Sequence, residues 1–238
     1  MTVTRTAAIH QPNFFPWLGY FDKIARSDVF VFLDDVQFPK TGGVWTNRVK
    51  LMVAGEPKWL TASINRQYHG TLMINEMTFV HGSPWRSKMI KTLQSQYSKH
   101  PFYEQTMDIL SPLLMNPESN ISEYNIHAVT GLASVLGLDT TNFCRSSDYP
   151  SRDSSTRRLC SLACAVSADT YICGGGADGY QDDQIFSSYG LTLRYQNYSH
   201  PCYPQYGYQD FVPGLSIIDA IMNLGFRAIS DMLKCPHI

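Results

Sequence analysis

Apolar residues near the start of the chain form two short runs on either side of a segment with helical periodicity. Residues 29–33 are all apolar, which is typical of a strand buried on both faces of a parallel sheet. The run at 3–9 ends in Ala-Ala-Ile and indicates an earlier strand, while apolar residues at 17–26 recur at helical spacing. This order of strand, helix and strand predicts a βαβ unit with a right-handed crossover.

The middle of the chain has a different pattern. Residues 45–64 indicate two extended segments joined by Gly-Glu-Pro, which predicts an excursion in the form of a β-hairpin. Helical periodicity then dominates, so we expect an inserted α-helical segment at about 84–136. Ser83 is the expected N-cap at its start, and Asn120 or Ser122 is expected to begin its last helix.

The last hundred residues return to alternating strands and helices. Strands are expected at residues 142–146, 170–173 and 191–196, and helices at residues 154–165 and 215–224. No internal repeat or linker divides the 238 residues. The sequence therefore predicts a single α/β domain over 1–238, with a mostly parallel central sheet of Rossmann-like type.

The composition of the chain limits the kinds of molecule that the protein is expected to bind. Hydrophobic residues make up 44% of the chain and the formal net charge is -1, so no basic excess is present to hold a nucleic acid. We expect no membrane span and no signal peptide, and hence a soluble, cytoplasmic protein. The six cysteines all lie in the second half and are expected to be mostly reduced. A homodimer is compatible with the sequence.

The loop that follows the first strand carries the strongest local signal for a binding site. Its sequence, HQPNFFPW, places His10, Gln11 and Asn13 between a strand end and a helix N-terminus, where α/β sheets bind ligands. Pro12 and Pro16 restrict the loop, which suits a preorganised site. The alternative is a rigid turn whose polar side chains satisfy backbone groups.

Acidic residues follow the second strand, close to where the first loop is expected. Asp34 or Asp35 could orient His10, act as a base or hold a metal, or both could be solvated residues at a strand end. Gln37 could contact a sugar or an amide. In the hairpin, Asn47 is a candidate substrate ligand, and Arg48 could bind a carboxylate or phosphate or form a structural ion pair. We expect His10, Gln11, an aspartate and Arg48 to line one pocket.

A glycine-rich stretch follows the strand at 170–173. Gly174, Gly175 and Tyr180 could approach a ligand closely, although the stretch matches neither a Walker loop nor a dinucleotide fingerprint. Cys173 could be a nucleophile there, but a core role is favoured.

Neither the cysteines nor the histidines carry a metal-binding motif. Cys160 and Cys164 stand four apart in a helix, where a core role is also favoured. Ser146 and Ser147 could add hydroxyl donors or cap a loop.

Four residues near the C-terminus are expected to reach the same pocket or to brace its walls. They are Tyr203, Gln205, Ser216 and Asp219. Ser216 and Asp219 stand three apart and share one face of the expected helix. Their alternative role is a simple N-cap with a partner like that of a capping box.

Six segments together resemble the WbqC-like family. They are residues 9–21 (IHQPNFFPWLGYF), 27–38, 45–48, 59–61, 203–205 and 211–219. Two departures concern residues 40–44, which lengthen the connection before the hairpin, and Cys173, where a small hydroxyl residue is expected.

The resemblance implies a role in O-antigen or other polysaccharide biosynthesis, where transfer of an amino acid, glycine in particular, onto a sugar is a suggested activity. The leading hypothesis is an acyl- or aminoacyl-type transferase acting on an amino sugar or small metabolite. Its catalytic residue would be His10, as general base or oxyanion donor, supported by Asp34 or Asp35. The donor could be acyl-CoA, an acyl carrier or a nucleotide. The alternatives are a nucleotidylyltransferase-like enzyme, a non-catalytic binding protein of a biosynthetic complex, and a hydrolase.

Overall fold

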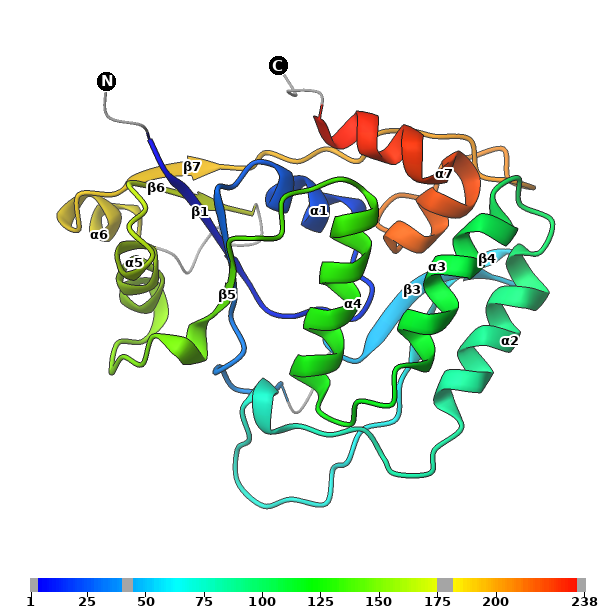
Figure 1. The fold of residues 1–238 in the computed structure, drawn as a ribbon, viewed down its shortest axis with the longest axis horizontal. Helices are drawn as coiled ribbons and strands as arrows, with labels where there is room; N and C mark the ends of the chain where they lie inside the picture. The colour runs from blue at the N-terminus through cyan, green and yellow to red at the C-terminus, as the bar shows by residue number, and fades with distance from the viewer. Residues whose placement is uncertain (1–3, 40–44, 175–181, 235–238) are drawn as a thin grey trace.

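A five-stranded parallel sheet forms the centre of the computed structural model, which describes residues 4–39, 45–174 and 182–234 (Figure 1). Its strands are, in spatial order, β5 (Phe143–Arg145), β2 (Val29–Phe32), β1 (Thr6–His10), β6 (Thr170–Cys173) and β7 (Thr192–Tyr195). Ala7 pairs with Val29 on one side of β1 and with Tyr171 on the other. The central strand is therefore β1, and the chain extends the sheet away from it in both directions.

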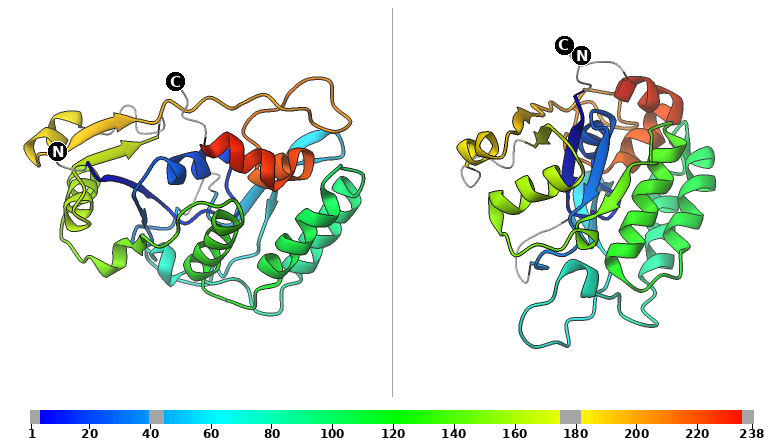
Figure 2. Two further views of the ribbon diagram at one scale, coloured as in Figure 1. Left: turned by 45° about the horizontal axis from the view of Figure 1, so that its top comes forward. Right: turned by 60° about the vertical axis from the view of Figure 1, so that its left-hand side comes forward.

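Both faces of the sheet are buried, as the apolar run in β2 predicts. Phe30 and Phe32 pack into one hydrophobic cluster with helices α1 (Leu18–Ala25) and α7 (Ile217–Lys234). Val29 and Val31 point into the other cluster, with α5 (Ser155–Ala165) and α6 (Asp183–Ser188). The two layers of helices on either side of the strands are visible in Figure 2.

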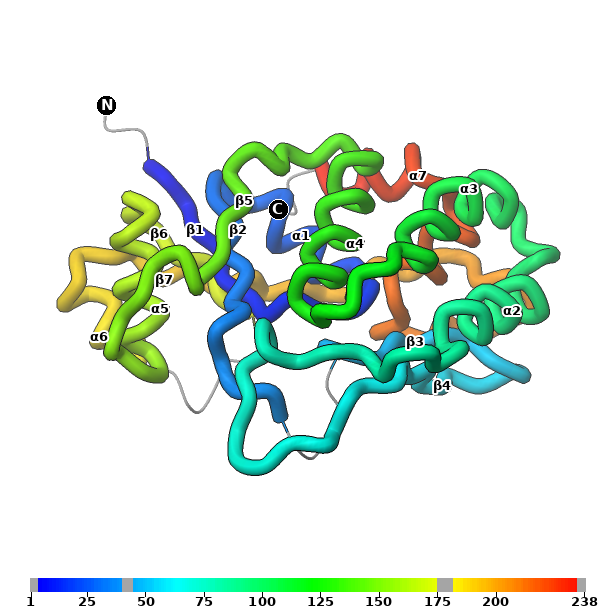
Figure 3. The backbone as a smooth tube through the Cα atoms, turned by 60° about the horizontal axis from the view of Figure 1, so that its bottom comes forward, coloured from blue at the N-terminus to red at the C-terminus, as the bar shows by residue number. Residues whose placement is uncertain are grey.

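The long connection from β2 to β5 leaves the sheet and builds a separate flank. It contains the hairpin β3 (Arg48–Val53) and β4 (Glu56–Thr61), followed by α2 (Trp85–Tyr97), α3 (Tyr103–Met115) and α4 (Ile121–Val135). The hairpin strands pair in antiparallel fashion and lie beside α2 and α3, at the opposite end of the molecule from α5 and α6 (Figure 3). This confirms the hairpin and the helical insertion.

The helix ends show where the sequence pattern was sufficient and where it was wrong. Asn120 caps α4 through a bond of 3.1 Å from the Glu123 amide to its Oδ1, as expected. Pro84, not Ser83, is the N-cap of α2. α6 was not predicted, and α7 runs ten residues beyond the expected end at 224, across a break at Gly225 with φ of 77°.

The break in α7 has a packing reason. A Cβ at Gly225 would lie 2.8 Å from Cδ1 of Phe102, so only glycine fits this conformation against that ring.

The finer prediction, that the sheet is of Rossmann-like type, stays a prediction.

Candidate functional site

A pocket of about 680 Å³ opens at the carboxyl ends of β1, β6 and β7. From β1 the chain adds β2 and β5 on one side and β6 and β7 on the other, so α1 and α6 leave on opposite faces of the sheet. A crevice at such a change of direction is where open α/β sheets bind ligands. We call it the switch-point pocket; its lining is Ile9, His10, Gln11, Trp17, Gly19, Tyr20, Lys23, Leu33, Leu159, Tyr171, Cys173, Gly174, Gln196, Asn197, Tyr198 and His200.

His10 lies at the end of β1 with its imidazole in a defined tautomer. Its Nδ1 is 3.1 Å from the carbonyl oxygen of Gln11, and because a carbonyl only accepts, Nδ1 carries the hydrogen. Nε2 is then a lone-pair acceptor. Burial, and secondly the charge of Lys23, lower the pKa of His10 to about 3, against the opposing effect of the Gln11 hydrogen bond. His10 is therefore neutral near pH 7.

Aromatic rings and backbone contacts hold this histidine in place. The centroid of its ring lies 4.7 Å from that of Tyr20 and 5.7 Å from that of Trp17, both in edge-on contact. The Tyr20 hydroxyl also donates to the Gln11 carbonyl at 2.9 Å. The position of the imidazole is thus fixed from β1 and from the first turns of α1.

The loop of residues 11–17 is anchored by distant parts of the chain. Asn125 Nδ2 on α4 donates to the carbonyl of Pro12 at 2.9 Å, and Ser216 Oγ donates to that of Phe15 at 2.7 Å. The Phe14 amide donates to the carbonyl of Trp45 at 2.7 Å. The prolines restrict this loop, and the tertiary bonds fix its path, which includes a positive φ of 45° at Phe15.

Lys23 is the main residue of the switch-point pocket that the sequence pattern did not predict. It lies on α1, four residues after Gly19, and only 5% of it is exposed. Burial lowers the pKa of the Lys23 ammonium to about 8, against the opposing influence of Cys173. A lysine on the apolar side of a short helix was the available signal, since such a residue is rarely buried without a partner.

The far wall of the pocket is built from β6 and from the segment after β7. Gln196 Nε2 donates to the Gly19 carbonyl and to Asp22 Oδ2, both at 2.7 Å, which ties this segment to α1. Cys173 and Gly174 come from the end of β6, as expected for a close approach to the pocket. Gly175 and Tyr180 lie outside the described residues.

His200 also lines the pocket, and no sequence pattern predicts its place there. Burial, and secondly the charge of Lys50, lower the pKa of His200, which favours its neutral form. Its position depends on the path of an irregular segment after β7, for which local periodicity carries no information.

Asp34 and Asp35 are placed elsewhere, which corrects the expectation of a shared pocket. The Asp34 carboxylate accepts from Ser147 Oγ at 2.8 Å and from Ser146 Oγ at 3.0 Å, and Arg158 Nη2 donates to Asp35 at 2.6 Å. After β2 the chain turns, with the Asp34 amide bonded to the Phe32 carbonyl. Both carboxylates therefore bind to side chains that follow β5 or belong to α5. They do not line the switch-point pocket.

The candidate ligands from the hairpin and its neighbourhood are also outside this lining. Asn47 Nδ2 donates to the Ala62 carbonyl at 3.0 Å and joins the two ends of the hairpin. The Arg48 guanidinium carbon lies 4.0 Å from the ring centroid of Trp59. Asn13 is buried within the first loop, and Gln37 is exposed and bridges to Met73. None of these four side chains lines the switch-point pocket.

The C-terminal candidates form a buried network around Asp219. The hydroxyls of Tyr203 and Tyr97 donate to its carboxylate at 2.8 and 2.9 Å, and Gln205 Nε2 donates at 3.1 Å. Burial raises the pKa of Asp219, while these bonds oppose the shift. Of the four candidates only Ser216 acts on the pocket, by bracing the first loop; it also caps α7, accepting from the Ile218 amide at 3.2 Å.

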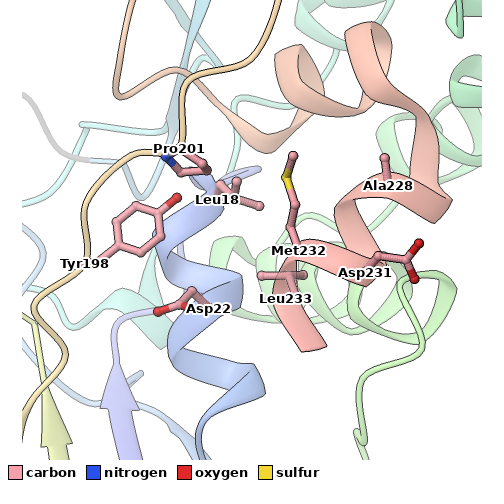
Figure 4. Close-up of a pocket in the computed structure, with 8 residues that line it drawn as sticks. All are labelled: Leu18, Asp22, Tyr198, Pro201, Ala228, Asp231, Met232 and Leu233. Carbon is pink, nitrogen blue, oxygen red and sulfur yellow. The ribbon is translucent and has the colours of Figure 1, made fainter. Parts of the chain in front are cut away.

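A second, apolar cavity of about 430 Å³ lies between α1 and α7. Leu18, Met232 and Leu233 converge there, with the hydroxyl of Tyr198 directed toward them (Figure 4). Tyr198 lines both cavities and so forms a wall between them. A Cβ at Gly19 would lie 2.6 Å from the Tyr198 ring, so glycine lets that wall pack against α1.

Two further searches concern only the described ranges 4–39, 45–174 and 182–234. Within them no helix has the length and apolar character needed to cross a membrane. In the same ranges no three His, Cys, Asp or Glu side chains are grouped closely enough to hold a metal ion.

Comparison with known proteins identifies the family of this chain. The sequence model of the WbqC-like protein family matches residues 11–231. The chain belongs to this family. It is 29% identical over 239 residues to the uncharacterized protein Rv1507c of Mycobacterium tuberculosis, which covers 97% of this chain and 99% of that protein. No solved structure matches the chain. The resemblance stated from the six sequence segments is thus confirmed.

Proposed function

We propose that this WbqC-like protein is an acyl- or aminoacyl-type transferase whose active site is the switch-point pocket. One observation carries the proposal: His10 stands at the end of the central strand in a fixed tautomer, and its Nε2 makes no hydrogen bond within the described chain. A lone-pair acceptor held in a ligand-sized pocket can receive a proton from a reacting group, and the low pKa of His10 makes it a weak base until a bound ligand offsets part of that shift.

The proposed step forms an amide or ester on a small acceptor. The nucleophilic nitrogen or oxygen of the acceptor attacks the carbonyl carbon of an activated acyl donor, such as a thioester, and transfers its proton to His10 Nε2. The bond from the acyl carbon to the leaving group then breaks, and the leaving group takes the electron pair and the proton. His10 returns to its neutral form, so the step balances without a further reactant.

The proposal gives His10 one role, that of general base, and not that of oxyanion donor. An oxyanion donor needs an N–H that faces the substrate, but the Nδ1 hydrogen is engaged by Gln11 and Nε2 carries none. Asp34 and Asp35 have their own partners away from the pocket and are not included in this mechanism. Family membership supports an amino sugar as acceptor and glycine as the transferred group, in O-antigen or related biosynthesis in the cytoplasm.

The test is product formation by the purified protein. Nucleotide-linked amino sugars and free amino sugars are mixed with acyl-CoA species or with amino acids and ATP, and mass spectrometry follows formation of the amide or ester. His10→Ala and His10→Gln should both lose about 100- to 10,000-fold in turnover, the usual cost of removing a general base.

The matched control is His127→Ala, which removes an exposed histidine from α4 and should leave turnover unchanged. Retention of most activity by His10→Gln, which keeps an acceptor but cannot take a proton, would show that His10 only positions the substrate.

A nucleotidylyltransferase-like reaction is the second candidate. It is favoured by the place of the pocket, where the sheet changes direction beside the N-terminus of α1, with a lysine in the lining. Formation of a nucleotide-linked product from a nucleoside triphosphate and a sugar phosphate, with release of pyrophosphate and with no acyl donor or amino acid present, would select it over acyl transfer.

A further inference from the structure

Lys23 carries a buried charge that the described part of the chain does not balance. The side chain lines the switch-point pocket and the residue is 5% exposed. Among the described residues no carboxylate lies within 4.0 Å of its Nζ, since the ion pairs found there involve only Arg26, Lys58, Arg145 and Arg158. A buried cation without a partner is costly, so it signals a group that arrives from outside.

The rest of the lining contains no acidic side chain that could serve this cation. The adjacent Asp22 bonds to Arg26 at 3.0 Å and to Gln196, and it lines the apolar cavity instead. Lys23 is therefore the one lysine or arginine in a pocket whose other polar side chains are neutral amides, hydroxyls, imidazoles and a thiol. The pocket therefore presents one positive charge to a ligand.

Gly174 lies close against Nζ on one side, and the pocket of about 680 Å³ provides the room for a small charged group on the other. Gly174 faces the amine, and a Cβ added there would lie 3.3 Å from Nζ. The lining also includes Gly19 and Trp17 at the start of α1, the end of a helix whose dipole favours negative charge. A carboxylate or a phosphate fits both the size and the charge of this position.

We propose that Lys23 binds an anionic group, a carboxylate or a phosphate, of the substrate in the switch-point pocket. This inference rests on the proposed function in that it names the substrate class for the same site. An activated amino acid, a sugar phosphate or a nucleotide sugar each carries such a group, while an uncharged sugar does not.

Anion binding also acts on the proposed base. The charge of Lys23 is the second cause that lowers the pKa of His10, so an anion beside Lys23 offsets it and makes Nε2 a better proton acceptor. The titratable groups that face these two residues are Tyr20 from α1, Tyr171 and Cys173 from β6, and Tyr198 and His200 from the segment after β7. Cys173 is the one of these groups that raises the pKa of Lys23, and the described lining contains no carboxylate.

The experiment measures stabilisation of the full chain by simple anions. Inorganic phosphate and acetate are titrated separately at pH 7 against chloride of equal ionic strength, with thermal unfolding as the readout. The anion that matches the site should raise the Tm of the wild-type protein by about 5–10 °C near 100 times its Kd. The arm that responds distinguishes a phosphate site from a carboxylate site.

Variants separate the site from general salt effects. Lys23→Met should lose the response and Lys23→Arg should keep it, while the exposed Lys58→Met should respond as the wild type does. A wild-type protein that responds to neither anion, or a Lys23→Met variant that responds equally, would overturn the inference.

Failure of the inference is distinguishable from failure of the proposed function. Turnover that is lost in His10→Ala, with no anion response in the wild type, keeps the transferase and removes the Lys23 site. An anion response that depends on Lys23, with turnover intact in His10→Ala, keeps the Lys23 site and removes His10 as the base.

Discussion

Buried polar groups have side-chain partners in one region of the described structure and lack them in another. Around Asp219, the carboxylate has three side-chain donors from α2 and from the segment before α7. In the switch-point pocket, Nε2 of His10 and the ammonium of Lys23 have no such partners among the described residues. A satisfied network stabilises the fold, while unpartnered groups that line a pocket are placed where a ligand can bind to them.

The aspartates after β2 belong with the Asp219 region in this comparison. Asp34 and Asp35 bond to Ser146, Ser147 and Arg158, and through them the ends of β2 and β5 are joined to α5. A carboxylate at a strand end is therefore not evidence of chemistry by itself. Its partners decide whether it holds the fold together or faces a substrate.

The largest expected effect on stability is at Asp219. Asp219→Ala removes the common acceptor of two tyrosines and a glutamine and leaves their donors buried, which should cost about 3–5 kcal/mol of unfolding free energy. Chemical denaturation measures it. The control is Asp231→Ala, an exposed aspartate on the same helix, which should change stability by less than about 0.5 kcal/mol. Equal losses in the two variants would contradict the contrast.

A pH-dependent effect of about 3 kcal/mol is expected at Lys23. Burial lowers its folded-state pKa from 10.5 to about 8, so the unfolded state binds more protons between these values. Stability should therefore rise with pH across this window, by that amount relative to Lys23→Met, in which the rise is absent. Denaturation of both proteins from pH 7 to 10.5 measures the difference, and Lys58→Met should follow the wild type. Parallel curves for wild type and Lys23→Met would mean that the charge of Lys23 has a partner.

The strands of the fold were predictable because buried parallel strands have a strong local signature. The apolar run at 29–33 contains β2, and β1, β6 and β7 lie where the sequence predicts strands. Two features depended on tertiary contacts instead. The short α6 has only one fully buried residue, Phe186, and the break at Gly225 exists because α7 meets Phe102.

The site was predictable in part for a similar reason. His10 follows directly from β1, so the strand end fixes its place at the sheet edge. Lys23 comes from the last turn of α1, where its place on the apolar side of the helix was the only local signal. His200 comes from an irregular segment after β7 that local pattern does not predict. The side toward which the chain turns after β2 is likewise set by its bonds to Ser146 and Ser147, which no local sequence rule contains.

The smallest expected effect concerns Ser216, which connects the two regions. Its Oγ donates to the Phe15 carbonyl in the loop beside His10 and accepts from the Ile218 amide as the cap of α7. Asn125 and the Phe14 amide provide other anchors of that loop. Ser216→Ala should cost about 1 kcal/mol as a lost cap. Because the loop also loses a bond, turnover should fall several-fold with little change in stability beyond the cap, through a lower kcat rather than a higher KM.

The matched control for Ser216 is Asn120→Ala, which removes the cap of α4 without touching the first loop. It should lose a similar unfolding free energy, measured by chemical denaturation, and keep its turnover. If the two variants had equal kcat, Ser216 would be a cap only, and the loop would be held by Asn125, by the backbone bond from Phe14 to Trp45 and by its own prolines. The His10 loop would then be rigid independently of α7, and the Asp219 region would stabilise the fold without any influence on the pocket.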